Sequence, residues 1–254
     1  MKIAMESPQH DEGARPAGAT DEESAARSVR SMFDGIARRY DLLNHVLSFG
    51  VDRIWRGRVA RAFRDVLTVP EARILDLCCG TGDMALALAR FRPRNARAIL
   101  ASDFSHEMLL LAERKFAGKG IESLEADAMR LPLTESSVDL VVAAFGFRNL
   151  VNYENALREI YRVLATGGQV AILEAAEPRG LFGRVYRVYF HRLLPRLGAL
   201  ISGNAGAYRY LPASVQRFPA PSDLLATMEK VGFCCAKWTP YTFGIAGLFQ
   251  AKKS

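Results

Sequence analysis

The stretch that decides the fold of this chain is Ile74-Leu75-Asp76-Leu77-Cys78-Cys79-Gly80-Thr81-Gly82-Asp83, which continues as Met84-Ala85-Leu86-Ala87-Leu88-Ala89. It predicts a short apolar strand, a turn with two glycines and a helix rich in alanine and leucine. Gly80 and Gly82 allow the backbone to turn sharply and, because they lack a Cβ, allow a ligand to come close. The amides at the start of the helix face the same point, so we expect a ligand-binding site at this turn.

Two classes of ligand fit a turn of this kind. The residues from Gly80 to Ala85 match the dinucleotide pattern G-x-G-x-x-[GA]. Asp76 and Asp83, however, place a carboxylate on each side of the turn, and these carboxylates would repel a pyrophosphate. They suit the ammonium and sulfonium groups of S-adenosylmethionine better. The stretch therefore favours S-adenosylmethionine, with a dinucleotide site and a purely structural turn as the alternatives.

The composition indicates one folded domain that follows a tail. The chain has 254 residues, 50% of them hydrophobic, which is enough for a substantial core. Residues 1–26 carry almost no large apolar side chains, so we expect a disordered tail there and a domain at 27–254. We find no run of 18 uncharged apolar residues and no secretory signal. The cysteines lack the spacing of a zinc site, and nothing else calls for a metal.

Strands and helices alternate through the middle of the chain. Apolar runs predict strands at 73–77, 97–102, 121–125, 138–145 and 169–174, with helices between them. Such alternation implies right-handed crossovers and a doubly wound parallel sheet. Two more strands near the C-terminus predict a hairpin that turns near Thr242 and has one antiparallel strand. The predicted fold class is α/β, with a mostly parallel, seven-stranded, Rossmann-like sheet.

Two segments lie outside this alternation. Apolar residues recur at helical spacing within residues 27–70 and predict added helices before the first strand. Residues 178–220 contain aromatic side chains, arginines, Pro195 and Gly198. We expect a helical insertion there that forms a lid over the substrate.

Acidic residues follow three successive predicted strands, at the edge where open parallel sheets bind ligands. Asp76 precedes the glycine turn, Asp103 ends the second strand, and Asp127-Ala128 follow the third. We expect Asp103 to bind both ribose hydroxyls and Asp127 to accept a hydrogen bond from the adenine amino group. Capping of a helix is the alternative explanation for either aspartate alone, and their combination with the glycine turn favours the binding site.

The fourth predicted strand ends at Phe145-Gly146-Phe147-Arg148-Asn149-Leu150. An arginine and an asparagine at a strand end can hydrogen-bond a substrate oxygen or hold a carboxylate. A salt bridge for Arg148 and a helix N-cap for Asn149 explain the same pair. Spacing alone does not decide between these interpretations.

From about Val29 to its C-terminus the chain resembles the ubiquinone/menaquinone biosynthesis C-methyltransferase family. The resemblance implies a Rossmann-like class I S-adenosylmethionine-dependent methyltransferase that methylates a ring carbon of a polyprenylated quinol, converting demethylmenaquinol to menaquinol. The benzoquinol intermediate of ubiquinone biosynthesis and a soluble phenol are alternative substrates. A nicotinamide-dependent oxidoreductase and a non-catalytic accessory subunit are alternatives from other classes. The segments that carry the resemblance are Met32-Phe33-Asp34, Ala37-Arg38-Arg39-Tyr40-Asp41-Leu42-Leu43-Asn44, Leu75-Asp76 with Gly80-Thr81-Gly82-Asp83, Phe145-Gly146-Phe147-Arg148-Asn149, and Tyr208-Arg209-Tyr210-Leu211 with Ser214.

The resemblance also implies roles for individual residues. The predicted S-adenosylmethionine site comprises Asp76, Gly80, Thr81, Gly82, Asp103, Asp127 and Ala128. A serine that some members use in the fourth strand is Ala144 here, so that contact is missing or made by the backbone. The family segment L-E-F-S-x-P is Leu173-Glu174-Ala175-Ala176-Glu177-Pro178 in this chain, which removes its hydroxyl.

A quinol carbon becomes nucleophilic once a neighbouring phenolic hydroxyl loses its proton, so the site needs a base and a group that stabilises the phenolate. We expect Arg148 to stabilise the oxyanion and Asn149 to orient the hydroxyl. The base is Asp76 or Asp103 acting through water, or Tyr210 from the lid. The sequence leaves this choice open.

The charge of the chain bears on its partners. The formal net charge is +7, and arginines cluster within 53–64 and 179–196. A solvated surface explains this surplus first, contact with an anionic membrane second and RNA third. We expect a cytoplasmic enzyme with a polyprenyl quinol substrate, peripheral contact with the inner face of the membrane and no nucleic acid. The oligomeric state is left open, with a homodimer as the commonest arrangement.

Overall fold

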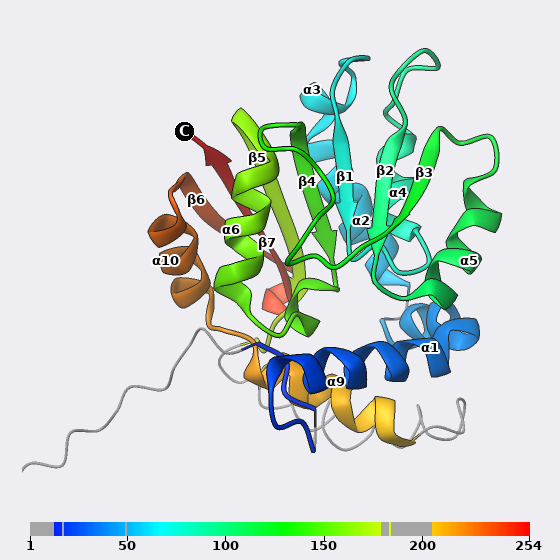
Figure 1. Ribbon diagram of the computed structural model, residues 1–254, viewed down its shortest axis with the longest axis vertical. Coiled ribbons are helices and arrows are strands. Elements are labelled where there is room, and N and C mark those ends of the chain that lie inside the picture. The colour runs from blue at the N-terminus through cyan, green and yellow to red at the C-terminus, as the bar shows by residue number, and fades with distance from the viewer. Residues whose placement is uncertain (1–12, 17, 49, 179–182, 184–204) are drawn as a thin grey trace, which may run out of the picture.

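The computed structural model describes residues 13–16, 18–48, 50–178, 183 and 205–254, without the side chains of 38–47, 205–209 and 211. A seven-stranded sheet with the order β3-β2-β1-β4-β5-β7-β6 lies at its centre (Figure 1). β7 runs antiparallel to both of its neighbours, and the other pairs are parallel. This confirms the mostly parallel sheet and the C-terminal hairpin. The strands are β1 (Ile74–Leu77), β2 (Ile99–Asp103), β3 (Ile121–Glu125), β4 (Val138–Ala144), β5 (Leu164–Ala175), β6 (Phe233–Tyr241) and β7 (Ala246–Lys253).

The strand order fixes where a ligand binds. β1 pairs with β2 on one side and with β4 on the other, so the order reverses between β1 and β4. In open parallel sheets this switch point opens a crevice at the carboxyl ends of the strands. The glycine turn and the Arg148-Asn149 pair follow these two strands and therefore meet at the crevice.

Helices cover both faces of the sheet. One face is buried under α2 (Val51–Ala62), α3 (Arg64–Leu67), α4 (Asp83–Ala89) and α5 (His106–Phe116). The other is buried under α6 (Tyr153–Val163) and α10 (Pro221–Val231), which lie in front of the sheet in Figure 1. β1 is buried along its whole length and β4 along most of it. This explains why both strands are nearly continuous apolar runs.

Two further helices lie across the carboxyl ends of the strands. α1 (Glu22–Leu47) and α9 (Ala205–Arg217) contact each other and run below the sheet in Figure 1. α9 lies within the predicted insertion at 178–220, and the role of that insertion as a lid stays a prediction. Residues 179–182 and 184–204 of the predicted lid lie outside the described residues. Among the described helices, none combines the length and apolar character needed to cross a bilayer.

The N-terminal boundary differs from the expected disordered tail at 1–26. α1 begins at Glu22, where the Asp21 carboxylate accepts a hydrogen bond from the Ser24 amide at 2.7 Å. The Gly13 and Ala14 amides donate to carbonyls of the loop before α6, at 3.1 and 2.7 Å. Residues 13–16 and 18–26 are therefore part of the fold, because backbone hydrogen bonds and a helix cap stabilise a segment that has few large side chains. Residues 1–12 lie outside the described residues.

Gly82 tests how tightly the turn is constrained. It has a φ of 85°, and a Cβ there would lie 2.2 Å from Cε1 of Phe116 in α5. We expect Gly82→Ala to destabilise the protein by about 1–3 kcal/mol, because the backbone is strained and the new methyl overlaps the ring. Urea unfolding measures the change.

Gly57→Ala is the matched control. Gly57 lies inside α2, and an added Cβ would have no atom within 4 Å. We expect this variant to gain up to about 1 kcal/mol from helix propensity. Equal stabilities for the two variants would contradict a constrained turn at Gly82.

Candidate active site

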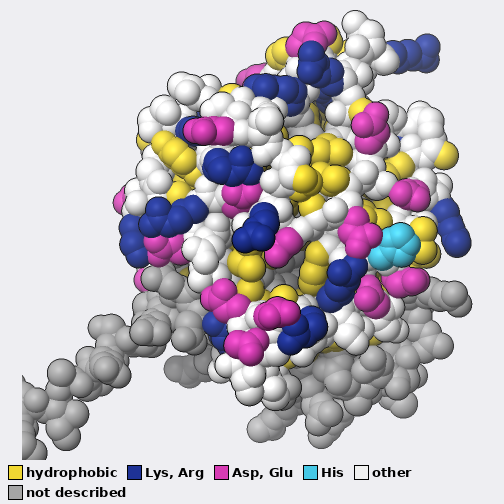
Figure 2. Space-filling model, viewed as in Figure 1, with side chains coloured by type: hydrophobic (Ala, Val, Ile, Leu, Met, Phe, Trp, Pro, Cys, Tyr) yellow, Lys and Arg dark blue, Asp and Glu magenta, His cyan; other side chains and the backbone are white. Residues whose placement is uncertain are grey.

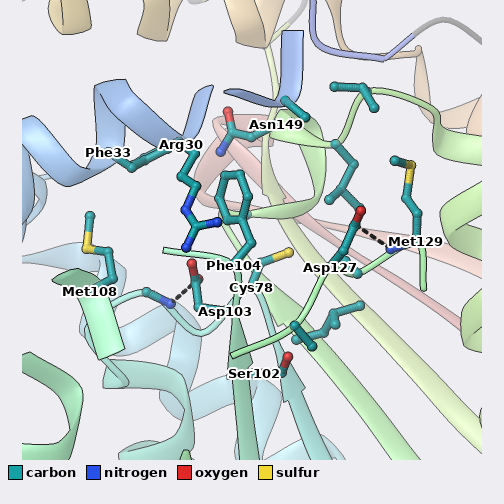
Figure 3. Close-up of a pocket in the computed structure, with 18 of the residues that line it drawn as sticks. Arg30, Phe33, Cys78, Ser102, Asp103, Phe104, Met108, Asp127, Met129 and Asn149 are labelled. Carbon is teal, nitrogen blue, oxygen red and sulfur yellow. Dashed lines mark hydrogen bonds between the residues drawn. The ribbon is translucent and has the colours of Figure 1, made fainter. Parts of the chain in front are cut away.

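A cavity of about 300 Å³ opens at the switch point, between α1 and the carboxyl ends of β1 to β4 (Figure 3). The predicted site residues that line it are Gly80, Asp103, Asp127, Ala128 and Asn149. The other predicted site residues, which are not among its lining residues, are Asp76, Thr81, Gly82, Arg148 and Tyr210. The structure thus brings half of the predicted set to one cavity.

The two central strands approach each other closely at the floor of this cavity. Cys78 and Phe145, which follow β1 and β4, both have positive φ values, 54° and 61°. A Cβ on Gly146 would lie 2.4 Å from the Cβ of Cys78. Only a glycine fits at this contact. Burial raises the pKa of the Cys78 thiol, so the thiol stays protonated and is a poor nucleophile.

Asp103 is held by backbone amides from two sides. The Gly80 amide donates to one carboxylate oxygen at 2.8 Å and the Ser105 amide to the other at 2.9 Å. Burial raises the pKa of Asp103 to about 6, although the amides of Ser105, Gly80 and Phe104 oppose the shift. Asp103 is therefore largely ionised at neutral pH. Its carboxylate connects the glycine turn to the start of α5.

Asp76 is fully buried beneath the turn. Among the residues that the structure describes, none forms a hydrogen bond of ordinary geometry with either carboxylate oxygen, and burial raises the pKa of the group to about 8. The nearby Ala85 amide and the Arg56 guanidinium lower the pKa only in part. A buried carboxyl without partners is costly for the fold and favours a ligand that supplies a positive charge or donors.

The carboxylate of Asp83 is paired with protein cations, whereas we expected the carboxylates on both sides of the turn to be available to a ligand. Lys115 of α5 contacts its Oδ1 at 2.9 Å and also donates to the Thr81 hydroxyl at 3.1 Å. Arg56 of α2 lies 3.7 Å from the other oxygen of Asp83. Protein cations already balance the charge of Asp83, so Asp76 carries the argument for a cationic ligand alone.

Part of the cavity wall is apolar. Ala128 is buried, and Phe104, Met108 and Met129 are among the residues that line the cavity beyond β2 and β3. Asp127 lies at its edge, where its carboxylate accepts the Met129 amide at 2.9 Å (Figure 3). Flat apolar walls with one acceptor at the rim suit an adenine ring with an exocyclic amino group.

Arg148 forms a buried salt bridge. Its Nη1 lies 2.9 Å from Glu174 Oε2, its own amide donates to Glu174 Oε1 at 3.1 Å, and its Nε donates to the Ser214 hydroxyl at 3.3 Å. The pair joins the ends of β4 and β5 to α9. Sequence reasoning missed Glu174 as this partner, although an acid that ends an apolar strand was a usable signal.

Asn149 is not the helix cap that its position suggested. Asn152 caps α6, accepting the Asn155 amide at 3.0 Å. Asn149 lines the cavity, and its buried Oδ1 has no hydrogen-bond partner in the described part of the chain. The Tyr210 hydroxyl is also buried, without a partner among the same residues, and burial raises the pKa of Tyr210. An unpaired buried acceptor beside a cavity favours a ligand donor.

Residues of α1 complete the cavity, and the sequence did not indicate them. Arg30 and Phe33 line it, and Figure 3 shows Arg30 pointing toward Asp103. Arg30 also forms an ion pair with Glu125 at the end of β3, while the Ser105 hydroxyl donates to Asp34. Helical spacing predicted α1, but no local signal shows which strand ends a helix will cover.

The Arg148–Glu174 pair leads to a stability prediction. We expect Glu174→Gln to destabilise the protein by about 3–5 kcal/mol, because it leaves a buried guanidinium without its counter-charge. Replacing both residues by methionine removes both charges and recovers most of this loss. Urea unfolding of the variants measures the effect.

Glu71→Gln is the control for this pair. Its partner Arg97 and Glu71 itself are largely exposed, so solvent screens the ion pair and the change is much smaller. If the two glutamine variants were equally stable, the buried pair would not be the structural link between β4, β5 and α9.

Comparison with known proteins identifies the family. Residues 20–253 match the model of the ubiE/COQ5 methyltransferase family. A demethylmenaquinone methyltransferase of Thermus thermophilus is 51% identical over 220 residues, covering 85% of this chain and 97% of the relative. A demethylmenaquinone methyltransferase of Deinococcus radiodurans is 48% identical over 236 residues, covering 92% and 95%. A ubiquinone/menaquinone biosynthesis C-methyltransferase of Geotalea daltonii is 42% identical over 230 residues, covering 89% and 96%.

Solved structures agree on the fold. A SAM-dependent methyltransferase of Thermotoga maritima has a TM-score of 0.62 at 18% identity, covering 89% of this chain and 100% of its own. The CurJ carbon methyltransferase has a TM-score of 0.64 at 14% identity, covering 92% and 68%. Both support the predicted Rossmann-like methyltransferase architecture. The chain therefore belongs to the ubiE/COQ5 methyltransferase family.

Proposed function

We propose that this protein methylates a ring carbon of demethylmenaquinol to form menaquinol, with S-adenosylmethionine as the methyl donor. The 51% identity to a demethylmenaquinone methyltransferase, across 97% of that relative, carries the proposal for the substrate. The cavity at the switch point supports the proposal for the donor. Methylation of a benzoquinol intermediate of ubiquinone biosynthesis is the second candidate, because the relative that is 42% identical is named for both pathways.

The residues at the cavity fit S-adenosylmethionine. Asp103 offers a largely ionised carboxylate to the ribose hydroxyls, and Asp127 offers an acceptor to the adenine amino group. Asp76 has no hydrogen-bond partner of its own and suits the charge of the methionine end. Gly80 lines the cavity and has no side chain to obstruct a ligand. Thr81 and Gly82 belong to the same turn but do not line the cavity. When bound, this group supplies an electrophilic methyl.

Asn149 and Arg148 serve the quinol side in this proposal. Asn149 lines the cavity with an unsatisfied Oδ1, which can accept the hydrogen of a phenolic hydroxyl and so fix its orientation. Arg148 is adjacent in sequence and lies in the same buried turn. Because Glu174 already binds and neutralises its guanidinium, we propose that Arg148 acts by positioning Asn149 and not as the group that stabilises the phenolate.

The proton acceptor is a carboxylate in this proposal. A general base works best with a pKa near the working pH, and burial raises the pKa of Asp103 to about 6 and that of Asp76 to about 8. Burial raises the pKa of Tyr210 above its ordinary alkaline value, so Tyr210 holds its proton and suits a donor role. We therefore favour Asp103, which lines the cavity, acting through water, over Tyr210 and over Asp76, which does not line the cavity.

A polyprenyl substrate places the enzyme beside a membrane. We propose a cytoplasmic protein that makes peripheral contact with the inner face of the bilayer, since a long isoprenoid tail partitions into lipid. A homodimer stays a prediction. Analytical ultracentrifugation of the full chain tests it.

The first test compares two quinols side by side. We expect S-adenosylmethionine-dependent methylation of reduced demethylmenaquinone to exceed that of the demethylated ubiquinol precursor, measured as transfer of a labelled methyl group. Preference for the precursor would assign the second candidate. Binding of S-adenosylmethionine without methylation of either quinol would refute the substrate proposal and leave the donor site standing.

The pH dependence of donor binding tests the role of Asp76. Burial holds its pKa near 8, so below that pH the carboxyl is protonated and must lose its proton to attract a cation. We expect affinity to rise between pH 6 and 8 by up to about tenfold per unit and then to level off. Calorimetry in buffers of different ionisation enthalpy measures the proton released.

Asp76→Asn is the control for this titration. The ligand is the same in both experiments, so the difference between the two curves reports Asp76 alone. We expect the variant to bind more weakly and to lose that rise. An unchanged curve would show that Asp76 does not contact the cationic part of the ligand.

A further inference from the structure

The outer face of α2 carries positive charge that the protein does not neutralise. Arg53, Arg58 and Arg61 are exposed there, and Arg64 is exposed at the start of α3. Within α2 and α3 the one exposed acidic side chain is Asp65, because Asp52 is buried against Arg56. None of these four arginines forms an ion pair with a described residue. This helix face is strongly basic.

Large apolar side chains are exposed on the same part of the molecule. Ile54 lies one turn before Arg58 on α2 and is 56% exposed. Phe243, in the short turn η3 (Thr242–Gly244) between β6 and β7, is 84% exposed and has a φ of 57°. Exposure of the apolar ring to water is unfavourable, and so is a positive φ at a residue with a bulky side chain.

Two contacts fix this turn beside α2. The Trp55 indole donates to the Thr242 hydroxyl at 2.9 Å, and the Arg58 guanidinium lies over the Tyr241 ring with 5.6 Å to its centroid. The turn that carries Phe243 therefore lies next to α2, so Phe243 borders the helix surface on which Ile54 and Arg58 are exposed. We call this surface, made of Arg53, Ile54, Arg58, Arg61 and Phe243, the α2 surface.

The front of the molecule differs from the α2 surface. Figure 2 shows basic and acidic side chains interspersed there, and α2 lies behind the sheet in the matching view of Figure 1. Several basic residues of other elements are paired, such as Arg30 with Glu125, Arg158 with Glu154 and Lys230 with Glu154. The exposed arginines of α2 thus concentrate positive charge without acidic partners on one part of the protein.

We propose that the α2 surface binds an anionic lipid bilayer, with Ile54 and Phe243 inserted among the head groups and the arginines on lipid phosphates. Arginine binds phosphate through paired donors, and aromatic side chains favour the interface between water and lipid. RNA would satisfy the arginines but gives no reason for the aliphatic Ile54 to be exposed. Lipid accounts for both the charge and the apolar side chains.

The position of the surface fits the substrate, a point that depends on the proposed quinol function. Trp55 packs against Phe145, which lines the cavity, with ring centroids 5.9 Å apart. Two side chains therefore separate the α2 surface from the cavity. On the proposed function, the bilayer would then lie close to the wall of the site that receives the quinol.

The test is co-sedimentation of the full chain with vesicles of phosphatidylcholine that contain about one-third phosphatidylglycerol, against pure phosphatidylcholine. We expect binding to the anionic vesicles that weakens with salt. Ile54→Ser with Arg58→Gln lowers this binding at least about fivefold, the contribution of one arginine near a charged membrane. Phe243→Ser lowers it independently.

Leu110→Ser with Arg114→Gln is the matched control. These residues have the same spacing on α5, where both are exposed, and α5 covers the same face of the sheet. We expect this variant to bind vesicles like the unmodified protein, and near-equal thermal unfolding of both double variants excludes misfolding. Equal losses in the two double variants, or no loss in the α2 variant, would overturn the proposal.

Two more measurements separate this proposal from others. Methylation of a short-tailed quinol in solution should be unchanged in the α2 variant, while methylation of a vesicle-embedded quinol falls. Because vesicle binding is measured without turnover, it stands or fails separately from the proposed reaction. Binding of single-stranded RNA that depends on Arg58, without vesicle binding, would assign the surface to RNA and overturn the proposal.

Discussion

The close approach of β1 and β4 at their carboxyl ends is the constraint on which the site depends. Cys78 and Phe145, which follow these two strands, have positive φ values. Gly146 packs against Cys78 so closely that no Cβ fits between them. The crevice that opens beyond them is the switch point of the sheet. The glycine turn, the second-strand aspartate and the Arg148-Asn149 segment all take their positions from it. The favourable burial of β1 and of most of β4 offsets the backbone strain at this point.

Several of the buried charged side chains of the protein lie at the site. Asp76 and Asp103 are both buried, and burial raises the pKa of each toward neutral values. Asp103 accepts the Gly80 amide of the turn and the Ser105 amide, whereas no described residue forms a hydrogen bond of ordinary geometry with Asp76. Arg148 and Glu174 balance each other nearby. The protein thus keeps one buried carboxyl poorly satisfied, and in the proposed function a ligand of complementary charge offsets this cost when it binds.

The helices outside the central alternation join chemistry to location. α1 closes the cavity with Arg30 and Phe33, and α9 reaches the Arg148–Glu174 pair through Ser214. α2 buries Trp55 against the wall of the cavity while its outer face carries arginines. One amphipathic helix therefore contributes both to the core near the site and to the surface where lipid binding is proposed. In the proposed function, this arrangement would bring a membrane-borne substrate and a water-soluble donor to neighbouring parts of one molecule.

The sequence by itself determined the succession of strands and helices along the chain, the glycine turn and the acids at the strand ends. Hydrophobic periodicity and turn chemistry act locally, so they can be recognised without the fold. It determined the family through short motifs such as Phe145-Gly146-Phe147-Arg148-Asn149. Only the tertiary structure decided which charges are paired. Asp83 is neutralised by Lys115 and Arg56, Arg148 is bound to Glu174, and Asp76 is left alone, since these partners lie on different elements and meet only when the chain folds. The placement of Gly13 and Ala14 was decided in the same way, because it depends on backbone hydrogen bonds to the distant loop before α6 and not on local composition.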